Sequence, residues 1–294
     1  MEYAPLVSVC VIAYNSSKYI WETLESIRMQ SYIDIELIIS DDASHDDTVD
    51  ICEKWLNLHE KRFIRTELVV SSVNTGVSAN CNRAYRKAKG DWIKGIAADD
   101  VLLPDCILVN ICHILKNKNI LILFSKVDLL ISSDSNMNKI SDLFNFSFFS
   151  LSAEEQKRYL LINGNCVPAA SVIMSRDLFL AHEFDERLPL LEDYPYWLYL
   201  TKRGIKLEFI DVVTVLYRIH NQSISTSSTK SILCKKTENK FFFLYLLPGM
   251  FTVAPLKTVI KIFHSDYPFM HLLYSQLLVC QRVCLQNTVC LICK

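Results

Sequence analysis

The chain has 294 residues, enough for one large domain with an appendage, and its formal net charge of −1 gives no indication of a nucleic-acid partner. Hydrophobic residues make up 51% of the sequence, yet no uninterrupted apolar run approaches the ~20 residues that a membrane-spanning helix needs. The first apolar run, Val7–Ala13, is short and passes directly into polar residues. We therefore expect no secretory signal and a cytoplasmic location.

The first hundred residues alternate between short apolar segments and segments with helical spacing. Val7–Ala13 is almost wholly apolar and rich in β-branched residues, which is typical of a strand covered on both faces. The other strands predicted here are Ile35–Ser40, Glu67–Ser71 and Trp92–Ala98, and the helices end near Gln30, His59 and Lys89. This alternation predicts an α/β fold with a doubly wound, mainly parallel sheet.

Acidic pairs follow two of these strands. Asp41 and Asp42 follow the second strand, and Asp99 and Asp100 follow the fourth. Carboxyl ends of parallel strands meet at one sheet edge, where open α/β folds bind ligands. Adjacent carboxylates repel each other unless donors or a cation offset their charge, and Mg²⁺ or Mn²⁺ holding a substrate diphosphate would do so. The alternative is that one aspartate caps the helix that begins near Pro104.

The middle of the chain continues the pattern less regularly. We expect helices from Pro104 to about Lys116 and from Glu192-Asp193 to Gly204, and strands over Ile120–Ser125, Ala169–Met174, Leu207–Ile210 and Val213–Ile219. Ser132–Ser150 is polar and then rich in Phe, and it predicts a long loop over the acceptor.

The composition changes near Ser223. We predict a main domain over residues 1–225 and a helical extension over 226–294. Within the extension, Val253–Phe263 has apolar residues on one face and lysines elsewhere. Two interpretations stay open: peripheral contact with an anionic membrane, or packing on the main domain or on a second subunit.

Eleven cysteines are scattered along the chain. Several lie in apolar runs, which suits buried thiols in a reducing compartment. Four cluster near the C-terminus with a single CxxC and no histidine at ligand spacing, so ordinary thiols are favoured over a zinc site. These four are Cys280, Cys284, Cys290 and Cys293.

Six stretches of this sequence resemble the family 2 glycosyltransferases, nucleotide-sugar enzymes with the GT-A fold. They are VSVCVIAYNSSKYIWETLESI, ELIISDDASHDDT, NTGVSANCNRAYRKAKGDWI, AADDVLLPD, LLEDYPYWLYL and VLYRIHNQSIS, within residues 5–225. Each is weak alone, but six in the correct order are a specific signal. The resemblance implies an inverting enzyme of the bacterial O-antigen or capsule type, with a UDP-sugar donor, Mn²⁺ or Mg²⁺ and a lipid-linked glycan acceptor at the inner face of the membrane.

The resemblance also assigns roles on the donor side. Asp42 corresponds to the acid that accepts a hydrogen bond from uracil N3–H, and Tyr14 to the residue that stacks on the ring. The local alternatives are a turn cap with Ser44 for Asp42, and a half-buried strand end for Tyr14. Asp99 matches the metal-binding acid, whose ion would bridge the two phosphates.

On the acceptor side, Asp193 falls where the family has its catalytic base. That carboxylate would take a proton from the acceptor hydroxyl while the oxygen attacks the anomeric carbon, and Glu192 would shape the pocket. The alternative is that both are first-turn acids favoured by the helix dipole. The other substrate-binding positions that the motifs imply are Ala13, Asn15, Asn74, Gly76, Asp100, Arg218 and His220, the last two at the diphosphate or the metal.

The sequence departs from the family pattern at two positions. Ala97 replaces the first acid of the usual Asp-x-Asp, and Cys81 stands where the family often has Arg. Both departures support an alternative, a catalytically inactive, membrane-associated nucleotide-sugar binding module. A second alternative, a nucleotidyltransferase, needs a Gly-rich and basic loop after the first strand, where this chain has Tyr14-Asn15-Ser16-Ser17.

Overall fold

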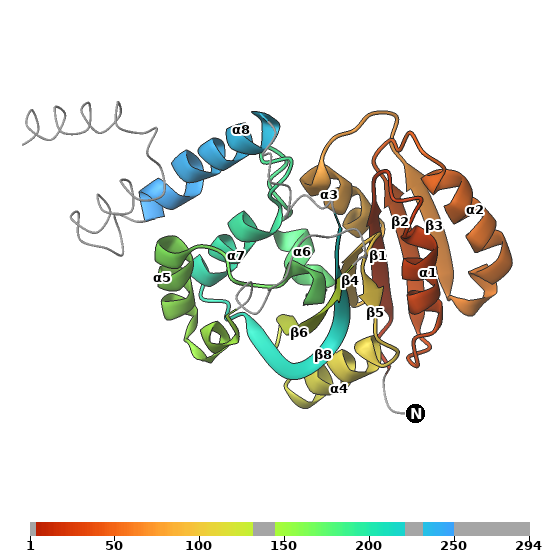
Figure 1. Ribbon diagram of the computed structural model, residues 1–294. Coiled ribbons are helices and arrows are strands. Elements are labelled where there is room, and N and C mark those ends of the chain that lie inside the picture. Colours follow the sequence, from red (N-terminus) through yellow and green to blue (C-terminus); the bar gives the residue numbers. More distant parts are fainter. Residues whose placement is uncertain (1–3, 132–144, 221–231, 250–294) are drawn as a thin grey trace, which may run out of the picture. The chain divides into compact units, whose positions relative to one another are not determined.

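The computed structural model describes residues 4–131, 145–220 and 232–249 (Figure 1). The strands are β1 (Val7–Ala13), β2 (Ile35–Asp41), β3 (Arg65–Val70), β4 (Trp92–Ala97), β5 (Val101–Leu102), β6 (Ile122–Ile131), β7 (Ile173–Ser175) and β8 (Glu208–Ile219). The α-helices are α1 (Ile20–Arg28), α2 (Thr48–His59), α3 (Val77–Lys87), α4 (Cys106–Lys116), α5 (Ala153–Asn163), α6 (Arg176–Ala181), α7 (Asp193–Lys202) and α8 (Ile232–Phe241). Short 3₁₀ helices cover Glu60–Arg62 (η1), Phe146–Ser150 (η2) and Ala169–Ser171 (η3), and a π-helical turn covers Phe242–Leu246 (η4).

The described strands form one eight-stranded sheet in the order β3-β2-β1-β4-β7-β6-β8-β5. β3, β2, β1 and β4 are mutually parallel, and β8 is parallel to β6. β7 runs antiparallel to β4 and β6, and β5 runs antiparallel to β8. The predicted α/β fold with a mainly parallel sheet is confirmed.

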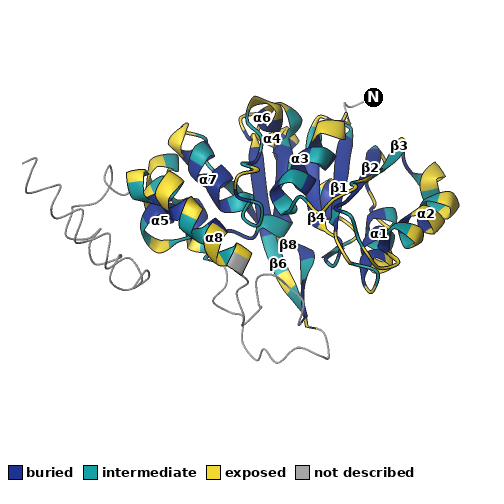
Figure 2. Cartoon of the chain, turned by 90° about the horizontal axis from the view of Figure 1, so that it is seen from above, coloured by how far each residue is buried: buried dark blue, intermediate teal, exposed yellow. Residues whose placement is uncertain are grey.

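Helices cover both faces of the parallel half of the sheet. Right-handed crossovers place α1 and α2 on one face and α3 on the other, and the view in Figure 2 shows this division. All seven residues of β2 are buried, as are most of those in β1 and β4. The near-continuous apolar run of Val7–Ala13 is therefore explained by burial on two sides.

The structure differs from the predicted elements at several places, and the predicted strand Ala169–Met174 is divided into a 3₁₀ helix, η3, and the short strand β7. α5 and α6 were not predicted, and Phe146–Ser150, predicted as part of a loop, is the 3₁₀ helix η2. Phe149 of η2 stacks on Phe209 of β8 at a centroid distance of 4.7 Å, which buries the Phe-rich stretch. The remainder of that predicted loop lies outside the described residues.

The two strands predicted over Leu207–Ile219 are one strand, β8. The polar break at Asp211 is absorbed by a register shift against β6, opposite Ser125 to Val127. Such a bulge lets a strand continue past residues that do not fit its alternation. The short β5 was not predicted, because two apolar residues carry no periodicity.

The chain divides into two compact units, 1–242 and 243–294. The predicted boundary at 225/226, the amphipathic segment Val253–Phe263 and the four C-terminal cysteines lie outside the described residues. The division at residue 225 therefore stays a prediction. Within the described part of the chain, no helix has both the length and the apolarity to cross a membrane.

Candidate active site

Several polar groups gather at the carboxyl ends of β1, β2 and β4. Register pairing sets Ala13 beside Asp41 and Ile12 beside Ala97. The Ala13 carbonyl accepts the Asp42 amide at 3.0 Å, and the Ile12 carbonyl accepts the Ala98 amide at 3.0 Å. The two acid pairs predicted from separate strands therefore flank the end of one strand, β1.

The Asp42 carboxylate is almost fully buried and accepts four hydrogen bonds. Its Oδ2 accepts the backbone amides of Thr75 at 2.8 Å and Gly76 at 2.7 Å. Its Oδ1 accepts the Thr75 hydroxyl at 2.6 Å and Arg83 Nη2 at 3.1 Å. In this structure Asp42 thus fixes the turn before α3. Its contact with a nucleotide base stays a prediction.

Arg83 supplies a positive charge that the sequence analysis missed. Its guanidinium contacts Asp42, the Thr75 hydroxyl at 2.7 Å and Asn80 Oδ1 at 3.0 Å. Asn80 in turn donates to the Ala13 carbonyl at 3.1 Å. Gly76, Asn80 and Arg83 have the i, i+4, i+7 spacing of one helix face, so helical periodicity was the signal that pointed to Arg83.

The loops after β1 and β2 are tied together beside this cluster. The Asn15 amide donates to the Ser44 hydroxyl at 2.7 Å, and Asn15 Oδ1 accepts the His45 amide at 2.8 Å. Asn15 has φ +48°, a conformation that Asn tolerates better than most residues. Tyr14 next to it is 43% exposed, so its ring is accessible for stacking.

Asp99 lies beyond the end of β4 and contacts the end of β8. Its Oδ2 lies 2.9 Å from His220 Nε2. The His220 ring packs on Tyr19 at a centroid distance of 4.8 Å. Asp99 keeps about a quarter of its side chain exposed, whereas His220 is nearly buried. A carboxylate and an imidazole from distant segments therefore meet at the same sheet edge.

Arg218 connects the residue Asp99 after β4 to helix α1. Its Nε donates to the Asp99 carbonyl at 2.7 Å, its Nη2 pairs with Glu22 at 2.6 Å, and its guanidinium lies 4.7 Å from the Tyr19 ring centroid. Its side chain is 8% exposed. In this structure it contacts protein groups, and a contact with a diphosphate stays a prediction.

Asp100 points inward. It is 1% exposed, and its Oδ1 accepts the Arg218 amide at 2.8 Å. Burial, and then the adjacent Asp99 carboxylate, raise the pKa of Asp100 well above its ordinary value. Asp100 thus bridges the end of β4 to β8, and Asp99 is the member of the pair that reaches solvent.

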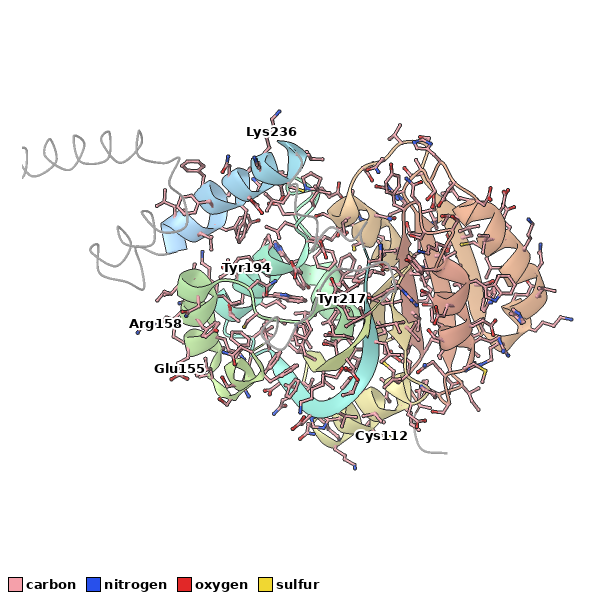
Figure 3. The ribbon with its side chains drawn as sticks, in the orientation of Figure 1. Cys112, Glu155, Arg158, Tyr194, Tyr217 and Lys236 are labelled. Carbon is pink, nitrogen blue, oxygen red and sulfur yellow. The ribbon has the colours of Figure 1, made fainter. Side chains whose placement is uncertain are left out.

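Glu192 and Asp193 begin α7 on another wall of the site. Asp193 Oδ1 accepts the Tyr194 amide at 2.6 Å, and Oδ2 accepts Asn165 Nδ2 at 2.8 Å. Burial raises the pKa of Asp193, and burial with the Asp193 charge raises the pKa of Glu192 to about 8. The start of α7 is anchored by Tyr194, labelled in Figure 3, whose hydroxyl donates to the Leu160 carbonyl of α5.

The loop before α7 packs against the N-terminus of α3. Ser78 donates from its hydroxyl to the Leu188 carbonyl at 2.6 Å, and Asn82 donates to the Phe184 carbonyl at 2.9 Å. A Cβ on Gly76 would lie 2.6 Å from Pro189 Cβ and from its carbonyl oxygen, so glycine allows this approach. The turn that Asp42 fixes is therefore in contact with the loop that leads into α7 and its acids.

Cys81 lies among these acids. Its thiol is nearly buried, and desolvation raises its pKa well above the ordinary value, with further contributions from Glu192, Asp193 and Asp42. Groups from β2, α3 and α7 thus share one electrostatic environment. The position where the family often has Arg carries a buried, neutral thiol here, and Arg83 meets Asp42 instead.

Among the described residues, no group of three or more His, Cys, Asp or Glu side chains has metal-binding geometry. The pair that does meet is Asp99 with His220. Mg²⁺ is usually held by one or two carboxylates completed by substrate phosphates, and Asp99 is the partly exposed carboxylate here that could serve in this way, with His220 beside it.

Comparison with protein families shows that the model described as "Glycosyl transferase family 2" matches residues 8–180, more than half of the chain. The chain belongs to this family. The matched region of this glycosyltransferase includes the carboxyl ends of β1, β2 and β4. The family match favours a transferase over the nucleotidyltransferase and the inactive binding module.

A curated relative agrees with this assignment, and two solved structures share the fold. The glucosyltransferase WfaP of Escherichia coli, named for a UDP-Glc donor and a GlcNAc-diphosphoundecaprenol acceptor, is 30% identical over 230 residues, covering 78% of this chain and 83% of the relative. S. aureus TarS with UDP-GlcNAc matches at TM-score 0.59 and 17% identity, covering 86% of this chain and 77% of TarS. The mannosyltransferase PcManGT of Pyrobaculum calidifontis, with GDP-Man and Mn²⁺, matches at TM-score 0.57 and 17% identity, covering 95% and 81%. The predicted GT-A fold is confirmed.

Proposed function

We propose that this glycosyltransferase moves a sugar from a UDP-sugar to a lipid-linked glycan with inversion at the anomeric carbon, during assembly of a bacterial surface polysaccharide such as an O-antigen or capsule. Two observations carry the proposal: an aspartate and a histidine meet beyond the ends of β4 and β8, and the acids at the start of α7 share the environment of Cys81 with Asp42. Asp99 meets His220 at the ends of β4 and β8, and Asp193 begins α7 on another wall.

The donor side follows from the accessible and charged groups around β1. Tyr14 offers an exposed ring for stacking on the base, and Asp42 would accept from the polar edge of the base in place of one of the four donors that it meets in this structure. Asp99 and His220 would hold Mn²⁺ or Mg²⁺ against the diphosphate. The cation would neutralise negative charge on the departing UDP.

The acceptor side follows from Asp193. Burial raises the pKa of Asp193 above the ordinary value of an aspartate, which strengthens its carboxylate as a general base. Its carboxylate takes the proton of the acceptor hydroxyl, the hydroxyl oxygen forms a bond to the anomeric carbon, and the bond from that carbon to UDP breaks. Attack on the face opposite UDP inverts the anomeric configuration.

The lipid-linked acceptor and a place at the inner face of the membrane are supported by likeness to WfaP, whose name includes a diphosphoundecaprenol acceptor. Residues 226–294, the extension in the proposed domain division, would make the peripheral contact with the membrane.

A donor screen tests the proposal. Thermal shift and transfer to a GlcNAc-diphospholipid are measured with UDP-sugars and GDP-mannose, each with Mn²⁺ and with EDTA. We expect stabilisation and transfer with a UDP-sugar and Mn²⁺ only. A response confined to GDP-mannose, or one that EDTA leaves unchanged, would overturn the donor or the metal assignment.

A further inference from the structure

The proposed base has a side-chain partner that no family motif pointed to. Asn165 lies in the loop between α5 and η3, and its Nδ2 donates to Asp193 Oδ2 at 2.8 Å. Its Oδ1 accepts the Val167 amide at 3.1 Å. Because a backbone N–H faces the amide oxygen, the NH₂ group must be the end that faces Asp193. The orientation of the amide is thus fixed by the chain itself.

The loop that carries Asn165 is anchored on both sides. Gly164, with φ +88°, ends α5, and its amide donates to the Leu160 carbonyl at 3.3 Å. The Leu160 carbonyl also accepts the Tyr194 hydroxyl from α7. The residue that follows the base and the loop that supplies its donor therefore share one anchor.

The donors that favour the Asp193 carboxylate are neutral: the Tyr194 amide on Oδ1, the Asn165 amide on Oδ2 and the Trp197 indole N–H. Among the described residues, no lysine, arginine or histidine pairs with Asp193. The titratable groups that face it are Glu192, just before α7, and Cys81 on α3, and ionisation of either would disfavour the carboxylate. Burial raises the pKa of Asp193, and the hydrogen bond from the exposed side chain of Asn165 lowers it again.

We propose that Asn165 is a positioning residue for sugar transfer, whose amide holds the Asp193 carboxylate in the orientation and the ionised form that receive the acceptor proton. This inference rests on the proposed role of Asp193. A carboxylate has about four acceptor sites, so the hydrogen bonds from Asn165 and Tyr194 leave Asp193 able to accept from the acceptor hydroxyl. The carboxylate is thereby held without being blocked.

The test compares Asn165→Ala, Asn165→Ser and Asn165→Asp with a matched control, Asn163→Ala. Asn163 is exposed at the end of α5, and its amide donates only to the Tyr159 carbonyl at 3.3 Å. For Asn165→Ala we expect kcat at pH 7 to fall by about tenfold, as for loss of one hydrogen bond to a charged group, with unchanged donor affinity. The acidic limb of the kcat profile moves to higher pH, so the loss shrinks as the pH rises.

The other variants sharpen this expectation. Asn165→Ser keeps a donor and restores part of the rate, while Asn165→Asp adds a second carboxylate and loses more rate than alanine at pH 7. Wild-type kcat and an unmoved acidic limb in Asn165→Ala would overturn the inference, as would an equal loss at every pH with a lowered Tm. Asp193→Asn is assayed alongside: retained transfer in that variant refutes the proposed base itself, whereas an inactive Asp193→Asn with a wild-type Asn165→Ala refutes only the role of Asn165.

Discussion

The imidazole Nε2 of His220 lies 2.9 Å from Asp99 Oδ2, although 121 residues separate the two in the chain. The pair exists because β8 runs beside β5 and Arg218 ties β8 to both members of the acid pair that follows β4. A carboxylate and an imidazole at one solvent-facing edge form the part of the site to which we assign the cation.

Replacing His220 by alanine should weaken metal dependence without removing donor recognition. One of the two proposed metal ligands is lost, so we expect the Mn²⁺ concentration for half-maximal transfer to rise by about tenfold or more. His113→Ala, on α4, is the control and should leave this value unchanged. An unaltered Mn²⁺ requirement in His220→Ala would show that the histidine only packs on Tyr19.

Replacing Gly76 by alanine should disrupt both the turn that binds Asp42 and the contact with the loop before α7. Gly76 has φ +89°, and an added Cβ would lie 2.6 Å from Pro189 Cβ and its carbonyl oxygen. We expect a loss of about 1–3 kcal/mol in the free energy of unfolding, together with weaker UDP binding. Gly204→Ala is a matched control, because Gly204 has φ +79° but no atom within 4 Å of the added Cβ. Equal effects of the two variants would assign the loss to backbone strain alone.

Replacing Tyr14 by alanine should affect the donor and not the fold. The ring is 43% exposed, so few packing contacts are lost. Loss of a stacking contact worth about 1 kcal/mol raises the donor KM about fivefold, with Tm unchanged. Trp21, 44% exposed on α1, serves as the control aromatic for truncation. A wild-type KM for Tyr14→Ala would contradict stacking on the base.

Glu192 should make the protein less stable as the pH rises. Its pKa is about 8 in the folded state, above the ordinary value of 4.5. Between these values the folded state binds more protons than the unfolded state, so the free energy of unfolding falls with increasing pH. Glu192→Gln removes this slope, and we expect its Tm relative to wild type to rise by roughly 7 °C between pH 5 and pH 8. A constant Tm difference across that range would contradict the raised pKa.

The parallel half of the fold and its acid pairs were predictable because each depends on local sequence. β-branched runs of six or seven residues specify strands, and the residues that follow parallel strands must share an edge. Arg83 was also within reach, since its spacing from Gly76 is helical. Cys81 suggested that a positive charge is missing from α3, but Arg83, two positions later on the same helix, pairs with Asp42.

Other features depend on contacts between distant segments. Asn165 reaches Asp193 only because the loop after α5 is anchored through Leu160 to Tyr194, and no local pattern specifies that contact. Arg218 looked like a phosphate ligand, yet in this structure it contacts Glu22 of α1 and Tyr19, the residue before α1. The continuity of β8 past Asp211 likewise follows from its register with β6.

The central claim is that Asp99 serves the donor and Asp193 serves the acceptor within one site. Calorimetric titration of UDP in Mn²⁺ into the wild type, Asp99→Asn and Asp193→Asn, with transfer assayed on the same samples, tests it most directly. We predict that Asp193→Asn binds UDP like the wild type but transfers no sugar, and that Asp99→Asn binds UDP at least tenfold more weakly. Wild-type UDP affinity in Asp99→Asn, or retained transfer in Asp193→Asn, would contradict the account.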